Sequence, residues 1–218
     1  PGGNAVSVAE LTIGLMLAQV RSLVKAAQAT RKGEWPRVNG LTLEGKTVGL
    51  IGLGDIGQEV ARRLKAFGAR VVAFDVQPDQ DFAVQYGVEL LPRSEILDQA
   101  DLVSLHCSLV PATRGMVNEE FLAQMKPGAY LINTARGELI EEAALLQALE
   151  EDRLAGAALD VFPRQPPRPD NPLLRHEKVL VTPHMGAHTD GATDKMGWGA
   201  VENCLAVLAG DEPPNRVV

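Results

Sequence analysis

The stretch VGLIGLGDIG, from Val48 to Gly57, decides the fold of this chain. It places three glycines in the spacing G-x-G-x-x-G between an apolar run and a helical pattern. Gly52 permits a tight turn, Gly54 lets a phosphate group approach the backbone, and Gly57 lets the next helix pack closely on the strand. The free amides at the start of that helix attract anions. The stretch therefore predicts a strand, a phosphate-binding loop and a helix in a dinucleotide-binding unit.

An acidic residue follows at the end of the next apolar run. Asp75 stands there, and a carboxylate in this place accepts hydrogen bonds from both hydroxyls of a ribose and repels a 2′-phosphate. The residues after it, Val76, Gln77 and Pro78, include no Arg or Lys that would attract a phosphate. The sequence therefore favours NAD over NADP as cofactor.

The rest of the chain alternates short apolar runs with amphipathic helical patterns. Strands are expected at 47–51, 70–74, 101–105, 129–133, 155–159 and 179–181, and helices at 56–67, 118–125, 141–150 and 191–208. Strands that are apolar throughout and separated by helices indicate a parallel sheet covered on both faces. The predicted fold is a Rossmann-type, doubly wound α/β sheet with flanking helices.

A long helix is expected before the sheet. Ser7 and Glu10 have the spacing of a capping box, in which each side chain satisfies the other's free amide. The apolar pattern then continues to about Lys32, and Gly33 is expected to end the helix. The apolar positions expected to form one buried stripe are Val8, Leu11, Leu15, Met16, Leu23 and Val24. Because this length exceeds what a compact α/β unit needs, we expect the helix to bridge to a structure outside the sheet.

Composition excludes several classes of partner. A formal charge of -7 in 218 residues argues against a nucleic acid or an anionic membrane surface as partner. No apolar run is long enough for a membrane span, and no signal peptide is recognisable. Cys107 and Cys204 match no metal or redox spacing, so we expect two reduced structural thiols, no metal site and a cytoplasmic location. The chain begins at Pro1, and we expect a further part of the protein upstream of it.

Three more motifs follow the glycine stretch in order: NTARG at 133–137, LDVF at 159–162 and TPHMG at 182–186. Together with the glycine loop and Asp75, they resemble the D-isomer-specific 2-hydroxyacid dehydrogenase family, which includes phosphoglycerate, glycerate/hydroxypyruvate, D-lactate and formate dehydrogenases. The resemblance implies a bridging helix and linker at 1–40, an NAD-binding domain at 41–188, and a tail at 189–218 that belongs to a mostly missing substrate domain. It also implies a homodimer formed through the cofactor domain.

The resemblance assigns catalytic roles to three residues. Arg136 is expected to grip the substrate carboxylate with two parallel hydrogen bonds and to polarise the adjacent carbonyl. His184 is expected to exchange a proton with the substrate oxygen as hydride moves between substrate and nicotinamide. Gln165 stands where most of the family has the glutamate that hydrogen-bonds this histidine. The implied substrates are a 2-hydroxy acid and its 2-keto acid, and this chain alone is expected to have little or no activity.

The cofactor-binding positions come from the glycine loop and from the same resemblance. Asp160 is expected to face the nicotinamide carboxamide, and Ser108 departs from a proline that is common in the family. The expected cofactor residues are Gly52, Gly54, Asp55, Ile56, Gly57, Asp75, His106, Cys107, Ser108, Thr113, Thr134, Ala135, Arg136, Asp160, His184, Gly186 and Ala187.

Two alternatives stay open, and Gln165 is the reason for the first of them. An amide can orient the imidazole but lends it no charge, so ketone reduction is expected to fall off at lower pH than in glutamate-bearing relatives. Formate dehydrogenases of this family carry glutamine at the matching position, which leaves formate oxidation as one alternative. The other is an NAD-sensing protein that has lost catalysis. Residues 184–189, HMGAHT, resemble the phosphoglycerate and hydroxypyruvate enzymes more closely, and the hydroxyacid interpretation is favoured.

Overall fold

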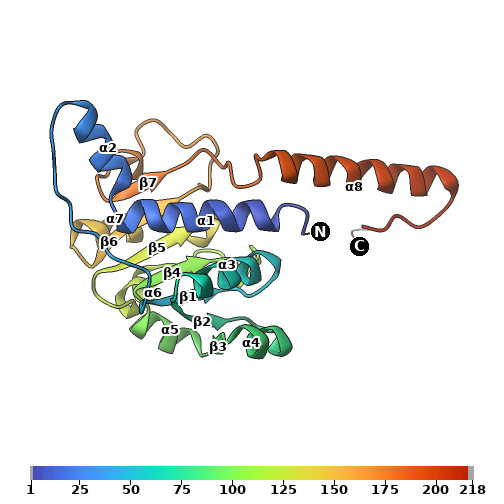
Figure 1. Ribbon diagram of the computed structural model, residues 1–218, viewed down its shortest axis with the longest axis horizontal. Helices are drawn as coiled ribbons and strands as arrows, with labels where there is room; N and C mark the ends of the chain where they lie inside the picture. The colour runs from blue at the N-terminus through green and yellow to red at the C-terminus, as the bar shows by residue number, and fades with distance from the viewer. Residues whose placement is uncertain (1, 216–218) are drawn as a thin grey trace.

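The computed structural model describes residues 2–215 and shows one parallel sheet at its centre (Figure 1). Its seven strands lie in the order β3-β2-β1-β4-β5-β6-β7, and every neighbouring pair is parallel. The strands are β1 Thr47–Ile51, β2 Arg70–Phe74, β3 Glu89–Leu90, β4 Leu102–Leu105, β5 Ala129–Asn133, β6 Leu154–Leu159 and β7 Val179–Val181. The predicted doubly wound α/β sheet is confirmed.

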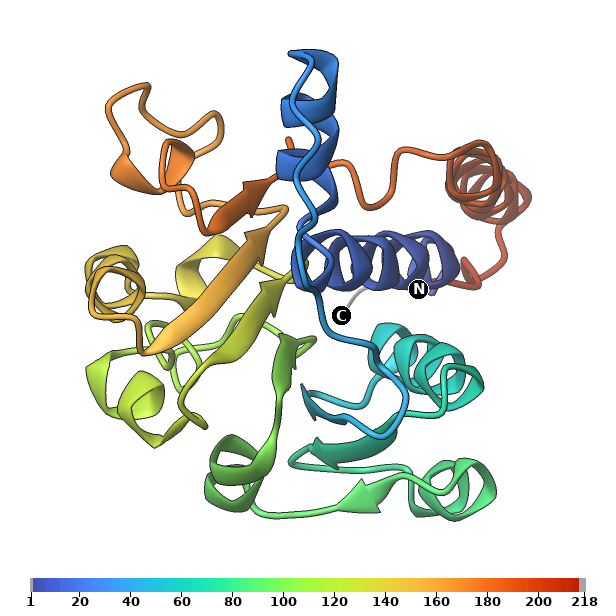
Figure 2. The ribbon, with the colours of Figure 1, turned by 60° about the vertical axis from the view of Figure 1, so that its left-hand side comes forward.

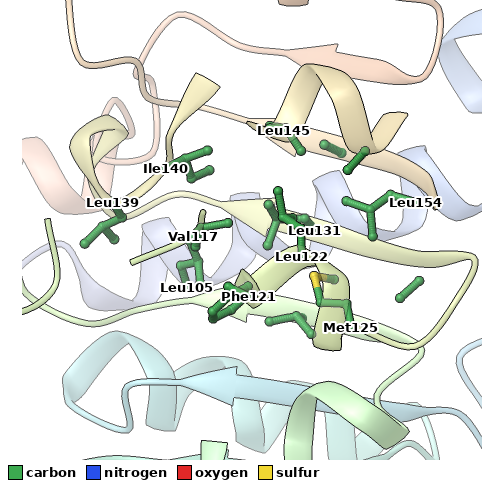
Figure 3. Close-up of a cluster of buried hydrophobic side chains, with 14 of the residues drawn as sticks. Leu105, Val117, Phe121, Leu122, Met125, Leu131, Leu139, Ile140, Leu145 and Leu154 are labelled. Atoms are coloured by element: carbon green, nitrogen blue, oxygen red, sulfur yellow. The ribbon is translucent and has the colours of Figure 1, made fainter. Parts of the chain in front are cut away.

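Helices cover both faces of the sheet (Figure 2). On one face, α1 (Ala5–Val20), α3 (Asp55–Ala66) and α4 (Gln80–Tyr86) share a core with the sheet. On the other face, α5 (Arg93–Gln99), α6 (Glu119–Gln124) and α7 (Glu142–Glu150) enclose a second core, part of which is drawn in Figure 3. Burial on both faces explains why the central strands β1, β4, β5 and β6 are mainly apolar along their length instead of alternating.

The N-terminal helix differs from its prediction in three ways. It begins at Ala5, before the expected capping box, and the Ser7 hydroxyl bonds to that of Thr189 instead of capping the helix. It also breaks near Ser22, whose φ of 48° is left-handed, so that α2 (Leu23–Arg31) leaves at 62° to α1. The start and the continuity of the predicted helix were therefore wrong, whereas its end just before Gly33 is confirmed.

The two halves of this broken helix have different surroundings. Three of the apolar positions expected in its buried stripe are buried in α1: Val8, Leu15 and Met16. Leu23 and Val24, which were expected to continue the stripe, are exposed on α2, where no residue is buried. α1 thus covers the sheet beside α3, while α2 points away from it (Figure 2).

Two short helices and one strand were not predicted. α4 and α5 have seven residues each and β3 has two, too few for a clear periodic signal. Two 3-10 turns, η1 (Gly137–Leu139) and η2 (Pro172–Leu174), lie in the later loops. The last helix, α8 (Asp190–Ala209), extends away from the sheet (Figure 1), and Ala192 is its one buried residue.

No single helix within residues 2–215 is long and apolar enough to cross a membrane. α1 and α2 taken together have the length and apolar composition of a membrane-spanning helix, but the chain bends by 62° between them.

Candidate active site

The glycine loop lies where the strand order reverses, between β1 and β4, at the carboxyl ends of the strands. Gly52 has a φ of 105°, and a Cβ on it would lie 2.6 Å from the backbone of His106 and Cys107. A Cβ on Gly57 would lie 2.4 Å from the Gly52 oxygen, whereas one on Gly54 would meet nothing within 4 Å. The loop is therefore packed tightly against the end of β4 and leaves open space beside Gly54.

A cavity of about 420 Å³, here called the cofactor hollow, adjoins this loop. Asp75 lines it, and its two carboxylate oxygens accept hydrogen bonds from the amides of Leu53 (2.7 Å) and Gln77 (2.9 Å). The carboxylate is thus held at the rim by the backbone on either side. Of the predicted cofactor residues, seven line this hollow: Gly52, Gly54, Asp75, His106, Cys107, Ser108 and Thr113.

Two titratable residues, His106 and Cys107, come directly after β4 and line the cofactor hollow. Burial lowers the pKa of His106 to about 4, so the ring is neutral at physiological pH. Its Nε2 pairs with the Ser104 hydroxyl at 2.9 Å, and its buried Nδ1 has no hydrogen-bond partner in the described part of the chain. Burial, together with the charge of Asp75, raises the pKa of the Cys107 thiol, which favours the protonated form.

The second cysteine differs from its prediction. Cys107 and Cys204 are both free thiols, but Cys204 is exposed on α8. The prediction that both thiols are structural was therefore wrong for Cys204 within this chain.

Arg136 lies in the loop after β5 and is exposed. The next residue, Gly137, touches the proline-rich loop after β6, since a Cβ on it would lie 2.0 Å from the Phe162 carbonyl carbon. This close backbone approach brings the loop that carries Arg136 against the loop that leads to Gln165. Ala135 is partly buried in the same turn, and the buried Thr134 pairs its hydroxyl with that of Thr12 on α1 at 2.8 Å.

His184 and Gln165 are in direct contact. Nδ1 of His184 lies 2.5 Å from Oε1 of Gln165, and Nε2 of Gln165 donates to the Phe162 carbonyl oxygen at 3.0 Å. Because the amide nitrogen is already used as a donor, Oε1 is the atom left to accept from the imidazole. Nδ1 is then the donor in this contact, and Nε2 of His184 has no hydrogen-bond partner within residues 2–215.

A second cavity, of about 360 Å³ and here called the histidine hollow, lies beside this pair. Its walls include Pro166, Pro167 and Pro183, and Asp160 also lines it. The prolines surround the histidine with apolar surface. Two predicted cofactor residues come shortly after His184: Gly186, which is buried, and Ala187, which is half-buried.

The residues of the cofactor hollow fit a dinucleotide. Asp55 and Ile56 open α3 beside Gly54, which as N-cap has no side chain to satisfy the first amides of the helix. Free amides at a helix start, with open space beside Gly54, are suited to a pyrophosphate. Asp75 at the rim suits a ribose, and the unpartnered Nδ1 of His106 is a polar atom that a bound group can satisfy.

Two residues of the site were missed by sequence reasoning. Arg93, at the start of α5, lines the cofactor hollow with its guanidinium 6.0 Å from the Phe121 ring centroid. The sequence argument for NAD considered only the residues directly after Asp75 and therefore left this cation out. Asn133 is fully buried at the end of β5 and bonds within the Arg136 loop; its place in the NTARG motif was the available signal.

Metal-ligating side chains do not gather at this site. Within residues 2–215, no three His, Cys, Asp or Glu side chains lie where they could hold a metal ion.

Comparison with known proteins identifies the family. The family described as D-isomer specific 2-hydroxyacid dehydrogenase, NAD binding domain, matches residues 13–186. The chain belongs to this family. The matched range includes the glycine loop, Asp75, Arg136, Gln165 and His184, which the fold brings to the carboxyl edge of one sheet.

Three similar proteins illustrate the relationship. D-3-phosphoglycerate dehydrogenase of Methanocaldococcus jannaschii is 44% identical over 220 residues, which cover 100% of this chain and 42% of that protein. Glyoxylate reductase of Thermofilum pendens is 40% identical over 224 residues, covering 100% of this chain and 66% of that protein. The crystal structure of the TT0316 protein from Thermus thermophilus has a TM-score of 0.92 at 43% identity, covering 100% of this chain and 70% of that one. The chain thus spans less than half the length of the first of these relatives.

Proposed function

We propose that this chain is the cofactor-binding part of an NAD-dependent dehydrogenase. The enzyme transfers hydride between the nicotinamide and a D-2-hydroxy acid or its 2-keto acid. A phosphoglycerate-like or hydroxypyruvate-like substrate is favoured, and the similar proteins include a D-3-phosphoglycerate dehydrogenase and a glyoxylate reductase. The observation that carries the proposal is the 2.5 Å contact between His184 and Gln165, beside the loop of Arg136. It provides an oriented proton carrier, and the adjoining Arg136 loop carries a guanidinium that forms no ion pair within residues 2–215. Reduction of a 2-keto acid needs both groups.

The chain's own residues supply binding and proton transfer. The exposed Arg136 guanidinium binds the substrate carboxylate with two parallel hydrogen bonds. Gln165 holds Nδ1 of His184, so that Nε2 donates a proton to the ketone oxygen in reduction and accepts one from the alcohol in oxidation. When bound, the nicotinamide supplies or accepts the hydride.

The other predicted cofactor contacts are part of this proposal. The glycine loop and the start of α3 hold the pyrophosphate, Asp75 holds the ribose, and Asp160 faces the nicotinamide carboxamide. Asp75 favours NAD, because a carboxylate repels a 2′-phosphate. Arg93 lies in the same hollow with the opposite charge, so the preference is to be measured with both cofactors.

The domain boundaries and the assembly also belong to this proposal. We assign 1–40 to a bridging segment, 41–188 to the cofactor domain and 189–218 to a tail that packs on a substrate domain. Exposed apolar residues on α8, among them Trp198 (68% exposed) and Leu208 (83% exposed), support such a contact. We further propose a cytoplasmic homodimer formed through the cofactor domain. The exposed apolar side chains of Leu23 and Val24 on α2, in the adjoining bridging segment, are available to extend such a contact.

A substrate panel tests the activity. The full-length protein is supplied with NADH or NADPH and a series of 2-keto acids, and loss of the reduced cofactor is followed by absorbance. We expect reduction of hydroxypyruvate or phosphohydroxypyruvate with a preference for NADH. Binding of NADH without turnover of any substrate would instead indicate an NAD-sensing protein.

Gln165 favours one second candidate, oxidation of formate. That reaction releases no hydroxyl proton to a base, so an uncharged partner for His184 is sufficient. NAD reduction by formate, measured in the same panel, decides between the two activities.

A further inference from the structure

Two buried polar residues at the ends of neighbouring strands hold the loops that carry the proposed catalytic groups. Asn133 ends β5, and Asp160 directly follows β6, its neighbour in the sheet. Asn133 is 0% exposed and Asp160 is 1% exposed. A polar side chain in such a place costs free energy unless its hydrogen bonds are made inside the protein. Where these bonds go therefore indicates what the side chains do.

Asn133 bonds to the loop of Arg136. Its Oδ1 accepts from the Ala135 amide at 3.0 Å, and its Nδ2 donates to the Arg136 carbonyl oxygen at 2.9 Å. The side chain therefore closes the turn at both ends of the Ala135–Arg136 peptide. An amide is needed for this, because one atom must accept while the other donates.

Asp160 bonds to the loop of His184. Its Oδ1 accepts from the Thr182 hydroxyl at 2.6 Å and from the Met185 amide at 3.0 Å, and its Oδ2 accepts from the Gly186 amide at 3.0 Å. Its backbone oxygen also accepts from the His184 amide at 2.8 Å. No Lys, Arg or His forms an ion pair with this carboxylate within residues 2–215, so these donors alone compensate its burial.

The loop needs such support because of its backbone. His184 has a φ of 53°, a left-handed conformation that costs free energy in a residue other than glycine. The residues on both sides of it, Thr182 and Met185, are the ones that bond to Asp160. A carboxylate that accepts from both sides holds the turn in this conformation.

The two residues are also joined to each other. The Asp160 amide donates to the Asn133 carbonyl oxygen at 2.9 Å, which continues the ladder between β5 and β6 by one bond. The Arg136 loop and the His184 loop are thus fixed to one rigid point of the sheet. Their separation is set there, although the two residues lie far apart in the sequence.

We propose that Asn133 and Asp160 act as a pair of positioning residues, which fix Arg136 and His184 relative to each other through the loops that carry them. This role rests on the proposed hydroxyacid activity. It is separate from any contact of Asp160 with the nicotinamide, because the bonds described here lie within the chain itself. A misplacement of about 1 Å at such a site costs roughly 100-fold in rate.

Amide hydrogen exchange on this chain tests the positioning directly, without any activity. The variants are Asn133→Asp, which replaces the donor by an acceptor, and Asp160→Asn, which leaves one oxygen for three donors. Loss of protection is expected at Ala135 in the first and at Met185 and Gly186 in the second. Asp101→Asn is the matched control. Its carboxylate accepts from Thr47 and Lys126 at the amino ends of the central strands, away from both loops. The loop amides of Ala135, Met185 and Gly186 should therefore keep their protection in this variant.

Kinetics of the full-length protein then test the consequence. Asn133→Asp is expected to raise the KM for the keto acid, and Asp160→Asn to lower kcat, with kcat/KM reduced about 10- to 100-fold in each. The Kd of NADH should change less than about twofold in Asn133→Asp. Unchanged kinetics together with lost protection would overturn the proposal, as would a loss of NADH affinity in Asp160→Asn with the loop amides still protected.

Two further readouts keep the outcomes distinct. Thr182→Val removes one of the three donors to the Asp160 carboxylate. It is used in place of Asp160→Asn if Asp160→Asn does not fold. We expect Thr182→Val to lower kcat, but by less than Asp160→Asn. If the wild-type protein reduces no 2-keto acid, the proposed function fails, whereas the exchange experiment still reports whether Asn133 and Asp160 hold the two loops.

Discussion

At the scale of single residues, Gln165 distinguishes this site from glutamate-bearing relatives. Its Oε1 orients the imidazole of His184 while adding no charge beside it. Gln165→Glu places a carboxylate there, which stabilises the protonated ring. We expect the pH at which ketone reduction falls off to rise by about one unit, measured as the pH profile of kcat in the full-length protein.

Gln165→Ala is the control for this experiment. It removes the orienting hydrogen bond without adding charge, so kcat should fall about tenfold while the pH profile is not shifted upward. Identical profiles for wild type and Gln165→Glu would contradict an electrostatic role for this position.

His106 predicts a pH dependence of stability. Burial lowers its pKa in the folded chain to about 4, below the ordinary value of 6.5. The unfolded chain therefore binds more protons between these two values, and stability falls as pH falls through this window, by at most about 3 kcal/mol. His106→Gln removes this contribution, so urea denaturation at about pH 7 and about pH 4.5 should show a smaller loss in the variant. The exposed His188→Gln is the control and should behave as wild type.

At the scale of elements, the strands were predicted closely and the N-terminal helix was not. β1, β2, β5 and β7 have the predicted bounds, because each is a short, mainly apolar run bounded by turns. The break near Ser22 has no Gly or Pro to announce it in the sequence. The apparent capping box failed because Ser7 found a partner, Thr189, that only the fold brings near.

Gly137 lies where the Arg136 loop touches the proline-rich loop after β6. Its substitution by alanine is expected to lower the free energy of unfolding, whereas the same substitution at Gly14 is expected to raise it. In Gly137→Ala the new Cβ meets the Phe162 backbone at 2.0 Å, which no side-chain rotation relieves. We expect a loss of about 2 kcal/mol in the free energy of unfolding, together with lower activity through the Arg136 loop.

Gly14→Ala is the matched control on α1, where a Cβ meets nothing within 4 Å. Alanine is the better helix former, so this variant should gain up to about 1 kcal/mol. Chemical denaturation of both variants measures the difference, and equal stabilities would contradict the close approach at Gly137.

At the scale of the whole molecule, α8 contributes little to the folded body. Ala192 is its one buried residue, and the exposed Trp198, Leu205 and Leu208 lie in its later turns. A chain ending at Gly197 should keep its free energy of unfolding within about 0.5 kcal/mol and aggregate less, because exposed apolar surface is removed. Chemical denaturation and light scattering measure the two effects, and a larger loss of stability would show that α8 helps to hold the sheet.

The sheet, the glycine loop and the acid at the end of β2 could all be predicted from the amino-acid sequence. These depend on local chemistry: apolar runs of strand length, glycines where the backbone turns or approaches closely, and an acid at a strand end. Family resemblance, and not spacing, suggested that Gln165 and His184 belong together.

The hydrogen bonds that hold the loops of the proposed active site could not be predicted from the sequence and depend on the fold. Asn133 and Asp160 belong to separate motifs, and no local pattern indicates that one faces the loop of Arg136 and the other the loop of His184. Contacts of this kind arise from strands that are neighbours in the sheet but distant along the chain. Their physical cause is the burial of polar groups at adjacent strand ends, which must find their hydrogen bonds in whichever loops the fold places there.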